Sequence, residues 1–144
     1  MKTITLMHGV PGSGKSYLAK QKGGTICSAD DYFMKDGEYH FDSKRLGQAH
    51  QSCKDKVLQA MKAGESIVVD NTNLTFKGCE PYIKMAVQHG YSCTIEEPQT
   101  TWKKNAEECA KRNVHNVPKE KIEMMLNKME SIYKIWEKAN DLLK

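Results

Sequence analysis

Short apolar runs alternate along the chain with longer segments whose apolar residues recur every three or four positions. The short runs predict β-strands, and they occupy residues 3–7, 25–28, 66–70 and 91–95. The run 66–70 is continuously apolar at its centre, which is typical of a strand covered on both faces. Because strands and helical segments alternate, the pattern predicts an α/β fold whose parallel sheet carries helices on both faces.

The longer segments predict helices from the period of their apolar residues. They cover residues 16–22, 42–63, 77–89, 101–112 and 118–143. Asp42 is expected to cap the second helix and Gly64 to end it. Pro118 fits the first position of the last helix, whose apolar stripe continues to Leu143 and predicts a helix packed on the core. Residues 34–40 are polar and predict a turn region.

The composition is that of one soluble globular domain over residues 1–144, with 39% hydrophobic and 28% charged residues. No run of about 18 apolar residues occurs, so we expect no membrane span. The five cysteines form no C-x-x-C pair, which favours small core residues over zinc ligands or disulfides. The N-terminal segment runs into a glycine-rich loop instead of a cleavage site, and together these features predict a cytoplasmic protein.

The segment His-Gly-Val-Pro-Gly-Ser-Gly-Lys-Ser follows the first predicted strand and matches the motif G-x-x-x-x-G-K-[ST]. Its glycines allow positive φ and a close approach of the backbone to an anion, and the next helix adds its positive end. In this motif Lys15 reaches the β- and γ-phosphates of a nucleotide, and the Ser16 hydroxyl binds Mg²⁺. The motif predicts an ATP and Mg²⁺ site whose cradle consists of Gly9, Val10, Pro11, Gly12, Ser13, Gly14, Lys15 and Ser16.

Acidic and amide side chains follow the second and third predicted strands, at the edge where parallel sheets bind ligands. Asp70 ends the third strand in the place of a Walker-B acid and is a further candidate for Mg²⁺ binding. We expect Asp30 to take the proton from an acceptor hydroxyl and Asp31 to contact the acceptor, although spacing alone does not distinguish the two. Asn71 and Asn73 are further candidate acceptor contacts.

Arginine is rare in this chain, although it is the side chain best suited to two-pronged phosphate contacts. Arg112 is predicted to stabilise the moving γ-phosphoryl group from a small lid at about residues 110–118, and a surface ion pair is its alternative role. Arg45 is a candidate contact to the acceptor. His115 lies in the lid segment, and His50 falls on the apolar face of its helix, where a core position is expected.

Five segments together resemble, in order and spacing, the P-loop kinase domain of the Nedd-four-binding-protein-two family: GVPGSGKS, SADDYF, KDGEYHFD, IVVDNTN and EPQTTWKKNAEECAKRNVHNVPKEKI. That family is related to the kinase half of phage-type polynucleotide kinase-phosphatase. The resemblance covers nearly the whole chain and implies a P-loop NTPase fold with about four to five parallel strands. It implies ATP-dependent phosphorylation of a 5′-hydroxyl on nucleic acid, with Asp30 as general base, Lys15 and Ser16 on phosphate and Mg²⁺, and Arg112 as first lid arginine.

The departures from the phage-type kinase concern mainly the acceptor. Phe33 stands where that kinase has an arginine that contacts the acceptor's phosphate, and Asn116 stands at its second lid arginine. The acid before its Thr-Asn pair is shifted back to Asp70, with Asn71 in the original place. The Gln-Ser pair at 51–52 replaces a Trp-Asn pair that the nearer family tends to carry. The resemblance therefore specifies the phosphate donor more closely than the acceptor.

The sequence predicts a kinase that moves the γ-phosphoryl group of ATP to a hydroxyl of a nucleic acid or nucleotide, with a polynucleotide 5′-hydroxyl as the expected acceptor. Alternative acceptors are a 5-hydroxymethyl pyrimidine in phage-type DNA and a small nucleoside or metabolite. An alternative of another class is a non-catalytic, ATP-gated nucleic-acid-binding module, which needs Lys15 but not Asp30. A GTPase is excluded, because the segment after the third strand lacks the required glycine and residues 127–130 lie in an amphipathic helix.

Overall fold

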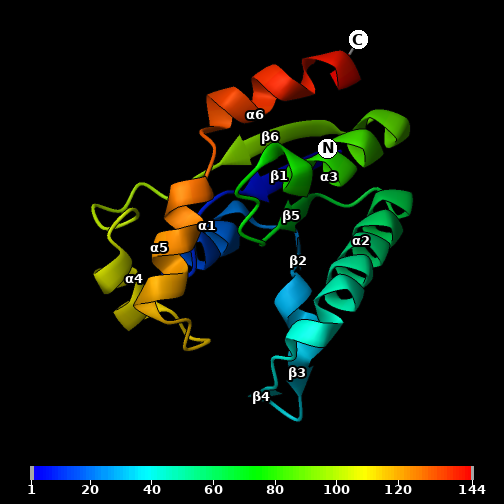
Figure 1. The fold of residues 1–144 in the computed structure, drawn as a ribbon. Coiled ribbons are helices and arrows are strands. Elements are labelled where there is room, and N and C mark those ends of the chain that lie inside the picture. The colour runs from blue at the N-terminus through cyan, green and yellow to red at the C-terminus, as the bar shows by residue number, and fades with distance from the viewer. Residues whose placement is uncertain (1, 144) are drawn as a thin grey trace.

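The computed structural model describes residues 2–143, and four parallel strands form its central sheet (Figure 1). The strands are β1 Thr3–Met7, β2 Thr25–Cys27, β5 Ile67–Val69 and β6 Ser92–Glu96. Their order in the sheet is β2–β5–β1–β6, so β1 and β5 lie in the middle. The predicted α/β fold with a parallel sheet is confirmed, and each strand begins and ends within one residue of its predicted bounds.

Helices cover both faces of the sheet, as predicted. They are α1 Lys15–Lys22, α2 Leu46–Lys62, α3 Phe76–His89, α4 Ala106–Arg112, α5 Lys119–Lys128 and α6 Ile132–Ala139. Side chains of β1 alternate between the faces: Ile4 and Leu6 pack in one large cluster with α2, α3 and α6, whereas Met7 packs with Ala19 of α1. Within residues 2–143, no helix combines the length and the apolar character that crossing a membrane requires.

Helices α4 and α5, with the loop that joins them, form a unit that we call the lid. Figure 1 shows the two helices side by side, beyond the end of the sheet toward which β6 points. Val10 of the glycine loop, Cys109 of α4 and Ile122 of α5 are buried in one apolar cluster. Because Val10 belongs to the phosphate-binding motif, this cluster holds the lid against the glycine loop.

The segment between β2 and α2 is more regular than the sequence predicts. It contains the 3₁₀ helices η1 Ala29–Phe33 and η2 Ser43–Arg45 and the antiparallel strands β3 Met34–Lys35 and β4 Glu38–Tyr39. Asp36 and Gly37, both with positive φ, close the β3–β4 hairpin. The Asp42 side chain accepts a hydrogen bond from the Lys44 amide in η2, so it caps that turn, and α2 begins only at Leu46.

All five cysteines are free thiols, and all but Cys93 are fully buried. Burial raises the pKa of Cys27 to about 11 and of Cys79 to about 12, which keeps both thiols protonated and unreactive. No group of three or more His, Cys, Asp or Glu side chains within the described part of the chain could hold a metal ion. Their burial confirms that Cys27, Cys53, Cys79 and Cys109 serve as core residues.

The prediction of one continuous helix over 118–143 is wrong. The chain is extended at Met129, and α6 starts after Ser131, whose hydroxyl accepts a hydrogen bond from the Lys134 amide. Glu130 occupies the break and binds two separate segments, residues 74–76 and His8. Its N–H donates to the Leu74 carbonyl (2.8 Å), its Oε1 accepts from the Phe76 amide (2.7 Å), and its carbonyl accepts from His8 Nε2 (2.7 Å).

The predicted helix 101–112 is also shorter than expected, since α4 starts at Ala106 with Asn105 as its N-cap. The residues before it form turns that place Trp102 against the glycine loop, where its indole N–H donates to the Gly12 carbonyl (3.1 Å). At the C-terminal end, residues Asn140–Leu143 form the 3₁₀ helix η3 instead of a further α-helical turn. Tertiary contacts determine where α4 begins and where α6 ends, and the period of the apolar residues does not reveal such contacts.

Replacing Glu130 by Gln should lower the free energy of unfolding at pH 7 by about 1 kcal/mol, because a charge-assisted hydrogen bond to Lys138 is lost. The Lys138 ammonium and the Phe76 amide hold the pKa of Glu130 below its ordinary value of 4.5. A lowered folded-state pKa means that this contribution is present above pH 4.5 and is lost as the pH falls through the folded-state value.

Urea unfolding at a series of pH values tests this prediction. The wild-type protein should lose stability in acid more steeply than the Glu130→Gln variant. Glu137→Gln, at an exposed position of α6, is the matched control and should keep the wild-type acid dependence. Equal acid dependence of the wild type and the Glu130 variant would contradict the role of this carboxylate.

Candidate functional site

The glycine loop forms a backbone cradle between β1 and α1. Gly12 and Gly14 have φ values of 80° and 105°, in the left-handed region. A Cβ on Gly12 would lie 2.1 Å from the Cys109 carbonyl oxygen, so only glycine fits beneath the lid here. Gly14 brings no capping side chain to the start of α1, which leaves the first N–H groups of that helix for an anion. The loop therefore has the backbone geometry of a phosphate site.

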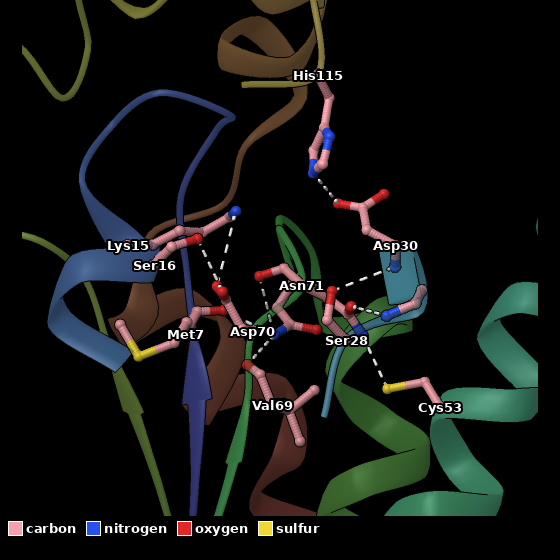
Figure 2. Close-up of polar contacts among 12 residues, drawn as sticks. Met7, Lys15, Ser16, Ser28, Asp30, Cys53, Val69, Asp70, Asn71 and His115 are labelled. Atoms are coloured by element: carbon pink, nitrogen blue, oxygen red, sulfur yellow. Dashed lines mark hydrogen bonds and ion pairs between the residues drawn. The ribbon is translucent and has the colours of Figure 1, made fainter. Parts of the chain in front are cut away.

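Lys15, Ser16 and Asp70 lie together at the cradle (Figure 2). Ser16 Oγ donates to Asp70 Oδ2 at 2.8 Å, and Lys15 Nζ lies 3.8 Å from Asp70 Oδ1. Lys15 and Asp70 are 11% and 12% exposed, and Asp70 Oδ1 is a buried oxygen without a hydrogen-bond donor within residues 2–143. A hydroxyl beside a carboxylate oxygen with spare acceptor capacity fits a hard cation such as Mg²⁺, which takes oxygen ligands and keeps several waters.

Asp30 lies at the start of η1, three residues beyond the end of β2. Ser28 caps η1 by accepting a hydrogen bond from the Asp30 amide (3.2 Å), and this directs the turn. The Asp30 carboxylate accepts from the Tyr39 hydroxyl (3.0 Å) and lies 3.5 Å from His115 Nε2, a contact that Figure 2 shows. Asp30 is half-buried and Asp31 is exposed. The structure therefore gives defined side-chain partners to Asp30, which the sequence alone does not distinguish from Asp31.

Asn71 and Asn73 were predicted to contact an acceptor, and the structure gives both amides partners inside the protein. Asn71 Oδ1 accepts from the Ala29 amide at 2.8 Å, which fixes the start of η1. Asn73 Nδ2 donates to the Met7 carbonyl at 2.6 Å, which fixes the end of β1. Both residues are buried. They occupy supporting positions that join the strand ends carrying the glycine loop and Asp30.

A cavity of 200 Å³ opens beside these asparagines. It is lined by His50, Asn71, Thr72, Asn73, Leu74, Thr75, Gly78, Tyr82 and Lys128. The expectation that His50 is a core residue is wrong, because its side chain is exposed and forms part of this cavity wall. Partial shielding and the charge of Lys54 lower the pKa of His50 from its ordinary value of 6.5, while the Asp30 carboxylate opposes this shift. The cavity therefore presents a neutral imidazole at pH 7, and its wall residue Asn71 binds the amide of Ala29, the residue before Asp30.

The two arginines lie in different settings. Arg112 Nε donates to Glu108 at 2.8 Å, and its guanidinium lies 3.7 Å from the ring centroid of Trp102. Since Trp102 also binds the Gly12 carbonyl, Arg112 is connected to the glycine loop through a single side chain. Arg45 is 64% exposed and pairs with Asp42, so the structure does not bring it to the other site residues.

Sequence reasoning missed Tyr39 as a partner of Asp30. The signal was present in the segment Lys-Asp-Gly-Glu-Tyr, because Asp-Gly is typical of a two-residue hairpin turn. A hairpin at this place folds residues 38–39 back toward η1, which brings the Tyr39 hydroxyl to Asp30. Phe33, at the position of the acceptor-binding arginine in the phage-type kinase, is buried at 4% exposure and anchors this hairpin instead.

The family model of the AAA domain matches residues 4–132, which is most of the chain. The chain belongs to the AAA domain family. This AAA domain is 43% identical over 129 residues to NEDD4-binding protein 2 of Homo sapiens, which covers 85% of the chain and 7% of the relative. The resemblance to the P-loop domain of that family is therefore confirmed.

Further matches to the AAA domain include two relatives and one solved structure. It is 32% identical over 105 residues to the protein named bifunctional polynucleotide kinase/RNA ligase in Autographa californica nuclear polyhedrosis virus, covering 62% of the chain and 15% of the relative. It is 30% identical over 122 residues to 2′,3′-cyclic-nucleotide 3′-phosphodiesterase of Pongo abelii, covering 78% and 28%. A chain of the Pnkp1/Rnl/Hen1 RNA repair complex superposes with a TM-score of 0.70 at 18% identity, over 95% of this chain and 46% of that one.

These matches define the fold and the glycine-loop motif more closely than they define the activity. The α/β fold is that of a P-loop NTPase related to kinases. The AAA domain spans 7% to 28% of the lengths of the three curated relatives, so most of each relative lies outside the matched region. The names of the relatives include both a kinase and a phosphodiesterase.

Proposed function

We propose that this AAA domain is an ATP- and Mg²⁺-dependent kinase that transfers the γ-phosphoryl group to a hydroxyl of a nucleic acid or nucleotide, with a polynucleotide 5′-hydroxyl as acceptor. One observation carries the proposal. The Lys15–Ser16–Asp70 group and the Asp30 carboxylate follow the adjacent strands β1, β5 and β2 and therefore share one edge of the sheet. This edge offers groups that bind phosphate and a separate carboxylate that can accept the proton of an alcohol.

The site residues contribute to this reaction in different ways. Ser16 and Asp70 would hold Mg²⁺, which would supply positive charge to the phosphates of the donor when bound. Lys15 and the backbone N–H groups of the cradle bind and orient the triphosphate. Asp30 takes the proton from the acceptor hydroxyl while the new O–P bond forms and the bond to ADP breaks. Arg112, connected to Gly12 through Trp102, stabilises the charge that develops on the transferred group.

The choice of acceptor is supported by the relatives and by the cavity whose wall residue Asn71 binds the amide of Ala29, next to Asp30 in the chain. Among the described residues, the cavity is lined by the cation Lys128 and by no carboxylate, and the neutral His50 imidazole offers a further polar contact, which suits a phosphate-bearing acceptor. The net charge of +4 also favours a polyanionic partner. One relative is named for polynucleotide kinase activity, and one structural neighbour belongs to an RNA repair complex.

A transfer assay tests the proposal. The protein is mixed with γ-labelled ATP, Mg²⁺ and a panel of acceptors: 5′-hydroxyl RNA and DNA, DNA with 5-hydroxymethyl pyrimidine, and free nucleosides. We expect label on the 5′-hydroxyl oligonucleotides, and no label on the same oligonucleotides that already carry a 5′-phosphate. Label only on the modified base or on nucleosides would identify the alternative acceptor. ATP binding without label on any acceptor would overturn the kinase proposal in favour of a non-catalytic module.

A further inference from the structure

Two aromatic side chains from different segments contact the Asp30 carboxylate at the same time. The Tyr39 hydroxyl, from β4, donates to Oδ1 at 3.0 Å, and His115 Nε2, from the lid loop, lies 3.5 Å from Oδ2. The two rings also stack on each other, with centroids 3.9 Å apart and an interplanar angle of 27°. Each carboxylate oxygen therefore has its own partner, and the two partners stabilise each other.

Tyr39 is held in this place by the aromatic cluster of the hairpin. Its ring lies edge-on to Phe33, which is fully buried, at a centroid distance of 6.1 Å. The backbone of the hairpin is also tied to η1, since the His40 amide donates to the Phe33 carbonyl (2.8 Å). Burial and the neighbouring Asp30 charge raise the pKa of Tyr39 above its ordinary value of 10.0, so the phenol keeps its proton and remains a donor.

His115 is held by a lid loop that is closed on itself. The Asn113 side chain donates to the carbonyls of Cys109, Ala110 and Val117 and accepts from the Val117 amide at 2.8 Å. The next residue after His115, Asn116, has a φ of 57°, which completes the turn. This arrangement directs His115 Nε2 to Asp30, while His115 Nδ1 is shielded and has no hydrogen-bond partner within residues 2–143.

We propose that Tyr39 and His115 are positioning residues that together fix the Asp30 carboxylate for the acceptor hydroxyl. The proposal rests on the function proposed above. A carboxylate offers about four acceptor positions, so two remain for the acceptor after Tyr39 and His115 have bound. Because His115 comes from the lid and Tyr39 from the hairpin, Asp30 is fixed only when both segments are in place. Asp30 is therefore positioned to accept a proton only when the lid, which also carries Arg112, is in place.

Single substitutions at the two positions test the proposal. Tyr39→Phe and His115→Ala should each lower kcat for phosphoryl transfer about tenfold or more, because a misplaced reacting group costs up to about 10²-fold. The KM for ATP and the thermal unfolding midpoint should stay at wild-type values. His115→Gln keeps a polar N–H group on the lid loop near Asp30 and should restore part of the rate relative to His115→Ala. Tyr32→Phe and His40→Gln are matched controls, since these side chains bind Gln48 and Glu38 instead, and both should react at the wild-type rate.

The double variants with Asp30→Asn separate a positioning role from a general structural role. If Tyr39 and His115 act through Asp30, neither substitution should lower the single-turnover rate further once Asp30 is replaced. A full additional loss in that background would overturn the positioning role, and so would wild-type kcat in both single variants. Unchanged transfer by Asp30→Asn itself would instead overturn the base assignment in the proposed function. The two failures are therefore distinguishable.

Discussion

Replacing Asp30 by Asn should lower the rate of phosphoryl transfer by about 10²–10⁴-fold while leaving ATP affinity close to the wild-type value. The amide keeps the size of the carboxylate and its bond to Tyr39, but it does not take a proton from the acceptor hydroxyl. Asp30 makes no contact with the Lys15–Ser16–Asp70 group among the hydrogen bonds and ion pairs of the described residues, so binding of the donor should be unaffected. Single-turnover transfer and calorimetric titration with ATP measure the two effects separately.

Asp31→Asn is the matched control for this variant. The two acids are adjacent, yet Asp31 is exposed and only Asp30 binds Tyr39 and His115. The Asp31 variant should therefore keep kcat within about threefold of wild type, and loss of its predicted acceptor contact should appear in the KM for the acceptor instead. If Asp31→Asn lost the activity and Asp30→Asn kept it, the general base would be Asp31 and our assignment of Asp30 would be wrong.

Replacing Lys15 by Ala should weaken ATP binding by about 10- to 100-fold, because a charge-assisted contact to the phosphates is lost. Transfer at saturating ATP should fall by a further 10²–10³-fold or so, since Lys15 also stabilises charge on the γ-phosphoryl group. The side chain is only 11% exposed and lies 3.8 Å from Asp70, so the loss also leaves a buried carboxylate without its nearest cation. ATP titration, transfer rates and thermal unfolding should be measured on the same variant.

Lys20→Ala provides the control for Lys15, because Lys20 is exposed in the last turn of the same helix. Its ATP affinity and its rate should match the wild type. ATP affinity that stays unchanged in Lys15→Ala would contradict the assignment of the glycine loop as the donor site. A lower unfolding midpoint alone, without weaker binding, would show that Lys15 serves the fold and not the nucleotide.

The sheet and the glycine loop could be predicted from the sequence because both depend on local patterns. A strand such as β5, buried on both faces, leaves a continuous apolar run, and the loop is fixed by glycines whose positions no other residue can fill. Candidate residues that directly follow strands, such as Asp30 and Asp70, could be found in the same way. Parallel strands bring their ends to one edge whatever the details of packing.

The features that the sequence did not predict depend on contacts between distant segments, and a periodic pattern carries no information about such contacts. The apolar stripe of the last segment continues through Met129, so periodicity predicts one helix where the structure has two. The preference for Asp30 over Asp31 comes from Tyr39 and His115, which lie 9 and 85 positions away in the chain. The exposure of His50 follows from the shape of a cavity whose walls come from three helices and a loop.

The break at Glu130 also determines how short a working version of this protein can be. All residues that we assign to phosphate transfer, from Lys15 to His115, precede the break, and the match to the family model ends at residue 132. Yet Glu130 holds His8 beside the glycine loop and the segment 74–76 that borders the cavity. Its partner Lys138 lies on α6, whose Ile135 and Ala139 complete the core under β1. A chain trimmed after Lys128 would therefore lose support on the donor side and the acceptor side together, although no reacting group had been removed.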